Sequence, residues 1–165
     1  MANPAPIQPE AGDATAASPQ VILVVDDEED ILTSLQSLFE LSLDDVKVVT
    51  ADSGIEALKV LDKQKVDVII TDYKMPGLNG LDFLRKADAS APGVPRILIT
   101  AFPDLDIAMR AINEAGIENF VTKPFQPDRV VEVVRSVLRK RRSQQMRDQS
   151  FARALDMLRR RLKAD

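Results

Sequence analysis

Five polar side chains whose chemistry suits phosphoryl transfer stand at the ends of short apolar runs: Asp26, Asp27, Asp72, Thr100 and Lys123. Carboxylates held close together repel one another, which raises the pKa of at least one of them unless a cation neutralises the charge. Mg²⁺ suits that role because it prefers oxygen ligands and binds through one or two carboxylates and a phosphoryl oxygen. The set would therefore supply a carboxylate nucleophile, a metal site, an ammonium and a hydroxyl for phosphoryl transfer to an aspartate.

Composition excludes several other chemistries. The 165-residue chain has no cysteine and no histidine. Disulfides, thiolate metal sites, cysteine nucleophiles and catalysis by a Ser-His pair or a histidine-bound metal are therefore excluded. Any chemistry must use carboxylates, hydroxyls, lysine and an added cation.

The apolar runs predict the elements that position these side chains. The runs are rich in β-branched residues, as strands buried on both faces are, and stretches of helical period lie between them. The predicted strands are 21–26, 46–51, 66–72, 95–101 and 118–123, and the predicted helices are 30–41, 54–63, 81–86, 104–115 and one that begins near Pro127. This alternation predicts an α/β fold, a three-layer doubly wound (βα)5 flavodoxin-like sandwich with parallel strand order 2-1-3-4-5. Ligands bind such sheets at the carboxyl ends of the strands.

Two of the helices have features that bear on packing. The stretch 54–63 has Ile55, Leu58 and Leu61 in one register, which predicts that this face is buried. The last helix has Pro127 near its first position. It then carries an apolar set that would cover the sheet: Val130, Val131, Val134, Val137 and Leu138.

Four segments carry a resemblance to a known family: VVDDE (24–28), TDYKMPGLNG (71–80), ITA (99–101) and FVTKPF (120–125). With them the sequence resembles the receiver domains of two-component response regulators over roughly residues 21–140. The resemblance implies a phosphoacceptor that takes its phosphoryl group from a histidine kinase or histidine phosphotransfer protein. It also implies a signalling domain that catalyses only its own phosphorylation and dephosphorylation, and that switches a surface toward a downstream protein effector.

The same resemblance implies roles for the residues at the site. Asp72 would be the phosphoacceptor, giving an aspartyl phosphate. Mg²⁺ would be held by Asp26, Asp27 and Asp72, together with the backbone carbonyl of Lys74. Lys123 would pair with a phosphoryl oxygen.

Further roles implied by the resemblance concern switching and lifetime. Thr100 would reach a phosphoryl oxygen, and Phe120 would be the aromatic residue that changes position with it. Lys74 and Phe102 flank the path of a hydrolytic water in relatives, so we expect slow self-dephosphorylation. The Lys123-Pro124 peptide bond is expected to be cis, which would aim the ammonium at the site.

The two ends of the chain differ from the part between them. Residues 1–20 are rich in Ala and Pro and lack Lys and Arg, which predicts a disordered lead-in rather than a signal peptide. Residues 139–165 hold ten Lys/Arg and three Asp/Glu, in a chain whose net charge is −4. We therefore expect an acidic receiver domain over 21–140 and a basic tail over 141–165.

The tail is predicted to be an amphipathic helix. Its apolar stripe has 4-3-4 spacing (Phe151, Leu155, Leu158 and Leu162), and we expect Arg153, Arg160 and Arg161 on roughly the opposite side. The pattern leaves three roles open. The tail could extend the last helix or pack back on the domain; it could form a homodimer or dock a partner; or it could bind nucleic acid or an anionic membrane.

Two other function classes remain open for the chain. One is a flavodoxin-like Mg²⁺-dependent phosphatase, marked by turnover of a small phosphate ester. The other is a regulator whose Arg-rich C-terminal helix binds nucleic acid, marked by steep salt dependence. The tail is too short for a helix-turn-helix domain, so we expect a single-domain regulator with output through protein contacts. No stretch approaches the roughly 18 apolar residues of a membrane span, so we expect a cytoplasmic protein.

Overall fold

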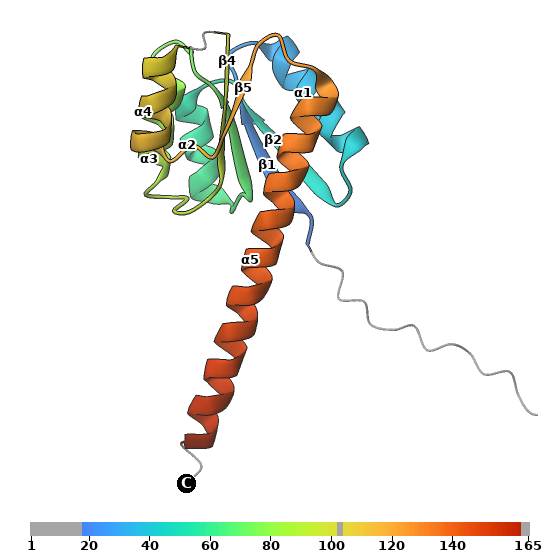
Figure 1. Ribbon diagram of the computed structural model, residues 1–165, viewed down its shortest axis with the longest axis vertical. Helices are drawn as coiled ribbons and strands as arrows, with labels where there is room; N and C mark the ends of the chain where they lie inside the picture. The colour runs from blue at the N-terminus through green and yellow to red at the C-terminus, as the bar shows by residue number, and fades with distance from the viewer. Residues whose placement is uncertain (1–17, 102–103, 163–165) are drawn as a thin grey trace, which may run out of the picture.

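A computed structural model describes residues 18–101 and 104–162 as five strands and five helices that alternate along the chain (Figure 1). The elements are β1 (Gln20–Val25), α1 (Glu29–Ser42), β2 (Val46–Ala51), α2 (Gly54–Lys63), β3 (Val68–Asp72), α3 (Gly80–Ala87), β4 (Arg96–Thr100), α4 (Leu105–Ala115), β5 (Asn119–Thr122) and α5 (Pro127–Leu162). The strands form one parallel sheet in the order β2-β1-β3-β4-β5. The predicted doubly wound α/β fold and strand order are confirmed.

Helices cover both faces of the sheet. One cluster of buried side chains lies between the sheet and α2, α3 and α4, and the other lies between the sheet and α1 and α5. Neighbouring residues of β1 alternate between them, with Leu23 in the first cluster and Ile22 and Val24 in the second. Both faces of the central strands are therefore apolar, which is why their sequences read as unbroken apolar runs.

The strand and helix ends differ from the predicted ones by small amounts. β2 and α2 have the predicted bounds, whereas β3 begins at Val68 rather than at residue 66. Val66 is buried but stands outside the strand, so an apolar run marks burial more reliably than sheet pairing. β1 begins at Gln20, inside the predicted lead-in, and residues 1–17 lie outside the described part of the chain.

The predicted burial of Ile55 is wrong, since 59% of that residue is exposed. The buried positions of α2 are Gly54, Ala57 and Leu61. A Cβ built at Gly54 would lie 2.9 Å from the Leu78 side chain, so the missing side chain lets this turn approach its neighbour closely. The first turn therefore rests on Gly54, and Ile55 is turned toward solvent.

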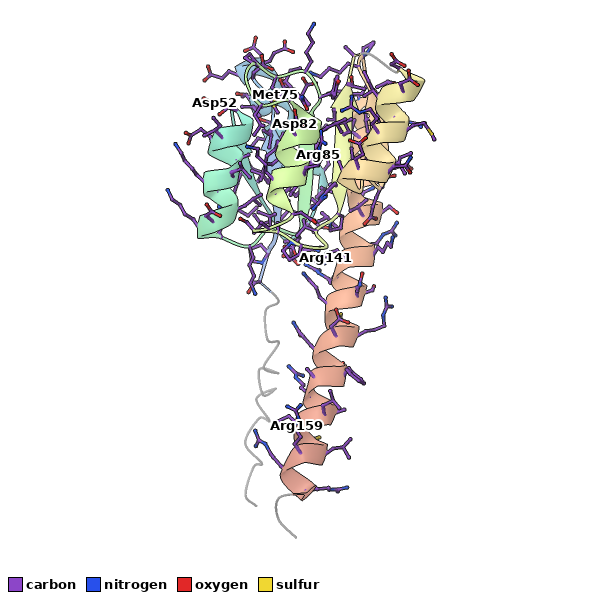
Figure 2. All side chains as sticks on the ribbon, turned by 90° about the vertical axis from the view of Figure 1, so that its left-hand side faces the viewer. Asp52, Met75, Asp82, Arg85, Arg141 and Arg159 are labelled. Carbon is purple, nitrogen blue, oxygen red and sulfur yellow. The ribbon has the colours of Figure 1, made fainter. Side chains whose placement is uncertain are left out.

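α5 runs past the predicted domain boundary at residue 140 without a break. Its first turns pack on the sheet through the predicted apolar set: Val130, Val131, Val134, Val137 and Leu138. The rest of the helix projects beyond the domain, with Arg141 at the base of the domain and Arg159 far out (Figures 1 and 2). Through residue 162 the tail thus extends the last helix, and the alternative of packing back on the domain is wrong.

Polar contacts fix the helix where it leaves the domain. The Arg141 guanidinium donates to the Gly93 carbonyl oxygen at 3.0 Å, and the Gln145 side-chain amide donates to the Asp67 carboxylate at 2.8 Å. Both acceptors lie in loops at the amino-terminal edge of the sheet, opposite the edge where β1 and β3 end. Among the described helices, none has both the length and the apolar character needed to cross a membrane.

Candidate functional site

Three carboxylates meet where β1 and β3 end. Because these two strands are hydrogen-bonded neighbours, Asp26, which follows β1, lies beside Asp72, the last residue of β3. Asp26 and Asp72 are buried and Asp27 is exposed, and one carboxylate oxygen from each lies within 4.8 Å of the others. The parallel sheet thus brings together side chains that are about 45 residues apart in the chain.

The Lys123 ammonium lies across this carboxylate group. Its Nζ is 3.0 Å from Asp26 Oδ2, 3.2 Å from Asp72 Oδ1 and 3.5 Å from Glu28 Oε1. The Lys123 backbone N–H donates to the Thr100 carbonyl oxygen at 2.8 Å, and the Lys123-Pro124 peptide bond is cis. Glu28 was not predicted as part of the site, because one more acidic residue after Asp27 carries no distinctive spacing.

The electrostatics of the site favour a bound cation. Burial raises the pKa of Asp72 above its usual range, and the charges of Asp26 and Asp27 add to the rise, although Lys123 opposes it. Burial alone would lower the pKa of Lys123, but its hydrogen bonds with Asp26 and Asp72 and their negative charges outweigh burial and raise it. Lys123 therefore remains an ammonium, and one positive charge does not fully satisfy the three carboxylates.

The donor set fits a hard divalent cation. Asp26, Asp27 and Asp72 offer carboxylate oxygens, which are the ligands that Mg²⁺ prefers over nitrogen or sulfur. A hollow beside Asp27, between α1 and α2, adds further carboxylates, among them Asp52 and Glu56. This concentration of negative charge would attract cations to the carboxyl edge of the sheet.

The loop after β3 is held against the site by a close backbone contact. A Cβ added to Gly80 would lie 2.1 Å from the Asp72 carbonyl oxygen, and the Gly80 N–H donates to the Tyr73 carbonyl oxygen at 2.8 Å. Asn79 caps α3 by accepting from the Asp82 N–H at 3.0 Å. No role was predicted for Gly80, although its place directly after Asn79, a residue type that often caps helices, was a usable signal.

The remaining predicted site residues fall in different surroundings. Thr100 is the last residue of β4 and is 1% exposed, whereas Lys74 is exposed just past β3. Phe120 in β5 is half-buried and packs against the core beneath α2, α3 and α4. Phe102 lies outside the described residues. The fold thus places Thr100 at the same edge as Asp72 and puts Phe120 two residues before the end of the neighbouring strand.

Comparison with known proteins agrees with this geometry. The family profile of the response regulator receiver domain matches residues 22–135. The hydrogenase transcriptional regulatory protein HoxA of Cupriavidus necator is 37% identical over 118 residues, which are 71% of this chain and 24% of HoxA. The C4-dicarboxylate transport transcriptional regulatory protein DctD of Rhizobium meliloti is 36% identical over 141 residues, 86% of this chain and 30% of DctD. The chain therefore spans only about a quarter to a third of the length of these curated relatives.

Solved structures match over nearly their whole length. The signal receiver domain of an HD domain-containing protein from Pseudomonas fluorescens has a TM-score of 0.71 at 31% identity, and the match covers 76% of this chain and 98% of that one. A CheY-like response regulator receiver domain protein from Methanospirillum hungatei has a TM-score of 0.71 at 27% identity, covering 77% and 99%.

Proposed function

Because the chain belongs to the receiver domain family of response regulators and has the phosphoacceptor signalling role of that family, we propose that Asp72 is the residue that accepts the phosphoryl group. The observation that carries this proposal is the position of the Asp72 carboxylate. Asp72 ends β3, its carboxylate lies 3.2 Å from the Lys123 ammonium, and one of its oxygens lies within 4.8 Å of carboxylate oxygens of Asp26 and Asp27.

The transfer step uses the groups around Asp72. An Asp72 carboxylate oxygen forms the new O–P bond while the N–P bond of a phosphohistidine donor breaks, and the electron pair of that bond stays on the imidazole nitrogen. Lys123 pairs with an equatorial phosphoryl oxygen. Mg²⁺, held by Asp26, Asp27, Asp72 and the backbone carbonyl of Lys74, would neutralise the charge on the transferred group.

The switch that follows uses Thr100 and Phe120. The Thr100 hydroxyl donates to a phosphoryl oxygen, and its movement toward Asp72 lets the Phe120 ring turn further inward. Because phenylalanine has no hydroxyl, the change is transmitted by packing alone. It alters a protein-binding surface around α4, β5 and α5, where Met109 and Ile112 are 52% and 57% exposed.

The lifetime of the aspartyl phosphate is set by residues that flank it. Lys74 obstructs the approach of a hydrolytic water, so self-dephosphorylation is slow; Phe102, for which the same role is predicted, lies outside the described residues. The exposed position of Lys74 next to β3 supports this role.

The phosphoryl donor is a histidine kinase or a histidine phosphotransfer protein, and the recipient of the signal is a protein effector. Residues 21–140 act as the receiver unit, 141–165 as its tail and 1–20 as a lead-in. The protein catalyses only its own phosphorylation and dephosphorylation. It works in the cytoplasm, where the ATP that charges histidine kinases is available.

The test is labelling with acetyl phosphate and Mg²⁺, followed by intact-mass spectrometry. We expect wild type to gain one phosphoryl group and Asp72→Asn to gain none. Asp62→Asn is the control. The Asp62 carboxylate lies away from the site, where it accepts a hydrogen bond from the Ser90 hydroxyl, and this variant should be labelled like wild type. Equal labelling of Asp72→Asn and wild type would overturn the assignment.

A further inference from the structure

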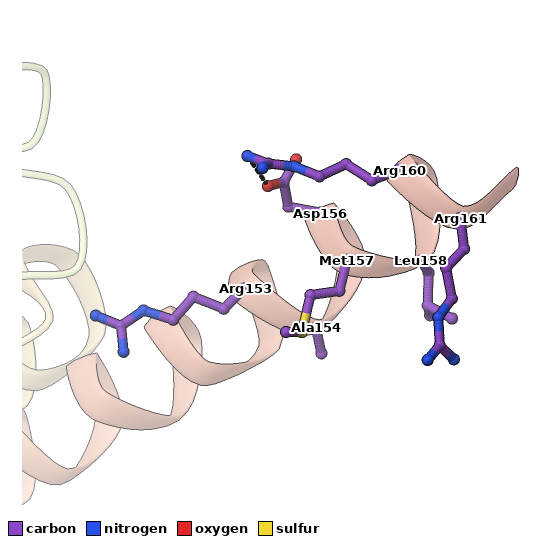
Figure 3. A pocket seen from close by; sticks show the side chains of 7 residues that line it. All are labelled: Arg153, Ala154, Asp156, Met157, Leu158, Arg160 and Arg161. Atoms are coloured by element: carbon purple, nitrogen blue, oxygen red, sulfur yellow. Dashed lines mark ion pairs between the residues drawn. The ribbon is translucent and has the colours of Figure 1, made fainter. Parts of the chain in front are cut away.

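The hollow near the far end of α5 is lined by that helix alone, from Arg153 to Arg161 (Figure 3). Within it, Arg160 forms an ion pair with Asp156 at 2.8 Å. The side chain of Arg161 lies next to Leu158, so the prediction that Arg161 lies opposite the apolar stripe of the tail is wrong (Figure 3). Because one helix cannot enclose a ligand, this outer hollow does not make a binding site.

Another hollow, at the base of the domain, is enclosed by three parts of the chain. It lies between the end of α2 with the loop that follows (61–67), the loop between α3 and β4 (90–94), and α5 at Arg141 and Gln145, and we call it the base hollow. Arg141 is labelled at this level of the molecule in Figure 2. The volume of the base hollow is about 360 Å³, within the roughly 300–1,000 Å³ of ligand pockets in proteins. It is therefore large enough for a small molecule.

The floor of the base hollow is apolar. Four buried side chains from the core beneath α2, α3 and α4 form it: Leu61, Val66, Ala91 and Val94. Water cannot hydrogen-bond to such a floor, so an apolar group that displaces this water lowers the free energy. A ligand that fits the base hollow therefore has an apolar body.

The cationic side chains beside this floor have hydrogen-bond donors without acceptors. The Nε–H of Arg141 is buried and has no hydrogen-bond partner among the described residues, although the same guanidinium donates to the Gly93 carbonyl oxygen through Nη1. Lys65 also lines the hollow and forms no ion pair within the described part of the chain. A buried donor without an acceptor costs free energy, and an incoming acceptor would recover it.

The other polar groups around the hollow are already engaged. The Asp67 carboxylate accepts from the Val21 N–H through Oδ2 and from the Gln145 side-chain amide through Oδ1, each at 2.8 Å. The Ser90 hydroxyl donates to the Asp62 carboxylate at 2.8 Å. The groups left over are thus donors that carry positive charge, and they suit a ligand whose polar end is an anion with acceptors only.

We propose that the base hollow binds a small organic monocarboxylate, with its apolar body on the floor and its carboxylate between the Arg141 Nε–H and the Lys65 ammonium. The two oxygens of one carboxylate provide an acceptor for each cation, and such charge-assisted hydrogen bonds are the stronger kind. Arg141 belongs to α5 and Lys65 to the loop before β3, so the bound ligand would tie the extension of α5 to the domain. The proposal does not involve Asp72, so its failure would leave the proposed function untouched.

Titration with benzoate, followed in nitrogen–proton NMR spectra of the full chain, tests the site. We expect saturable shifts confined to residues around the hollow, such as Val66, Val94 and Gln145, with a dissociation constant in the millimolar range because the ligand has few atoms. Benzyl alcohol has the same ring without the charge and should bind at least about tenfold more weakly. Inorganic phosphate has charge without an apolar body and should give no saturable shift there.

Three results of these titrations would overturn the proposal. Equal binding of benzoate and benzyl alcohol would mean that the cations are not used. Saturable binding of phosphate as tight as that of benzoate would mean that the apolar floor is not used. The absence of any saturable shift with benzoate in the millimolar range would mean that the hollow is not a carboxylate site.

Substitutions separate this site from diffuse attraction of an anion to a basic surface. Lys65→Met and Arg141→Lys each remove one donor while keeping a long side chain, and each should weaken benzoate binding by at least about fivefold. Lys63→Met is the control, since Lys63 is an exposed lysine that does not line the hollow, and it should bind like wild type. Equal weakening by Lys63→Met and Lys65→Met would contradict the proposed site.

Hydrogen exchange gives a second readout, which concerns the tie between α5 and the domain. Saturating benzoate should slow amide exchange in residues 141–149 of wild type, because the ligand holds both sides of the hollow. The same concentration should leave exchange in this segment of Arg141→Lys unchanged. Circular dichroism of each variant checks that α5 stays helical. Bound benzoate that left exchange at 141–149 unchanged in wild type would overturn the tie to α5.

Discussion

The Lys123 ammonium lies closer to Asp26, at 3.0 Å, than to Asp72, at 3.2 Å. In this arrangement the lysine neutralises part of the charge of the carboxylate group. When a phosphoryl group arrives on Asp72, the same ammonium can turn to it without crossing the site. The lysine thus has a structural role besides the role proposed for it in phosphoryl transfer.

Replacing Lys123 should expose this structural role. Lys123→Gln leaves Asp26 and Asp72 without a counter-ion, and we expect the free energy of unfolding to fall by about 2 kcal/mol at neutral pH without Mg²⁺. Millimolar Mg²⁺ should recover most of the loss. Urea unfolding with and without Mg²⁺ measures both effects. Lys59→Gln, which removes an exposed ion pair with Glu56, should change stability by less than about 0.5 kcal/mol either way.

Asp72→Asn should stabilise the metal-free protein at neutral pH. Folding raises the pKa of Asp72 above 3.8, its unperturbed value. Between pH 3.8 and the higher pKa of the folded state, the folded protein therefore binds more protons than the unfolded protein. The ionised carboxylate thus opposes folding above its folded pKa, and its cost disappears below pH 3.8. Thermal unfolding in a chelator should show the variant more stable than wild type at pH 7 and equal to it in acid.

Mg²⁺ should reverse that order. Wild type gains stability by binding the ion, whereas Asp72→Asn has lost a ligand. Fluorescence of Tyr73, the only tyrosine in a chain without tryptophan, follows the binding because this residue adjoins Asp72. The chelator experiment has its own contrary outcome. If Asp72→Asn unfolded at a lower temperature than wild type in the chelator, desolvation would not be the main cause of the raised pKa of Asp72.

Gly80→Ala should damage the site through the backbone. The added Cβ would lie 2.1 Å from the Asp72 carbonyl oxygen, so the chain at Asp72 must move. We expect a loss of about 2 kcal/mol in stability and a slower rate of labelling by acetyl phosphate. Gly93→Ala is the matched control, since Gly93 has φ +67° but no atom near its Cβ position. It should cost about 1 kcal/mol through backbone strain and leave labelling unchanged.

Lys74→Ala should shorten the lifetime of the aspartyl phosphate severalfold. In the proposed mechanism the long side chain of Lys74 obstructs the attacking water, and alanine would open its path. Loss of label after removal of the phosphodonor gives the decay rate. Lys65→Ala, an exposed lysine at the other edge of the sheet, should decay like wild type. An unchanged decay in Lys74→Ala would show that the water reaches Asp72 by another route.

The convergence of the site could be predicted from sequence because parallel strands end at one edge. Once Asp26, Asp72 and Lys123 were assigned to strand ends, their proximity followed from the strand order. Side-chain contacts from loops could not be predicted in this way. Glu28 reaches Lys123 only because the turn after β1 directs it there, and Gly80 approaches Asp72 only once α3 has packed.

The prediction of which face of α2 is buried failed because a contact with another segment decides how that helix packs. Ile55 has the spacing of a buried residue, but the close contact that Gly54 permits with Leu78 rotates the apolar side of α2 away from it. The tail of α5 was predicted as an amphipathic helix from its spacing. Where the helix leaves the domain it is held by contacts such as that of Arg141 with Gly93, which no local pattern encodes.

The unbroken course of α5 makes it a lever arm. From Leu138, the last buried residue on the sheet, to Leu162 the helix rises roughly 36 Å at 1.5 Å per residue. A tilt of about 5° at the sheet would carry the far end by about 3 Å. Any tilt of α5 on the sheet is thereby amplified in proportion to distance along the helix.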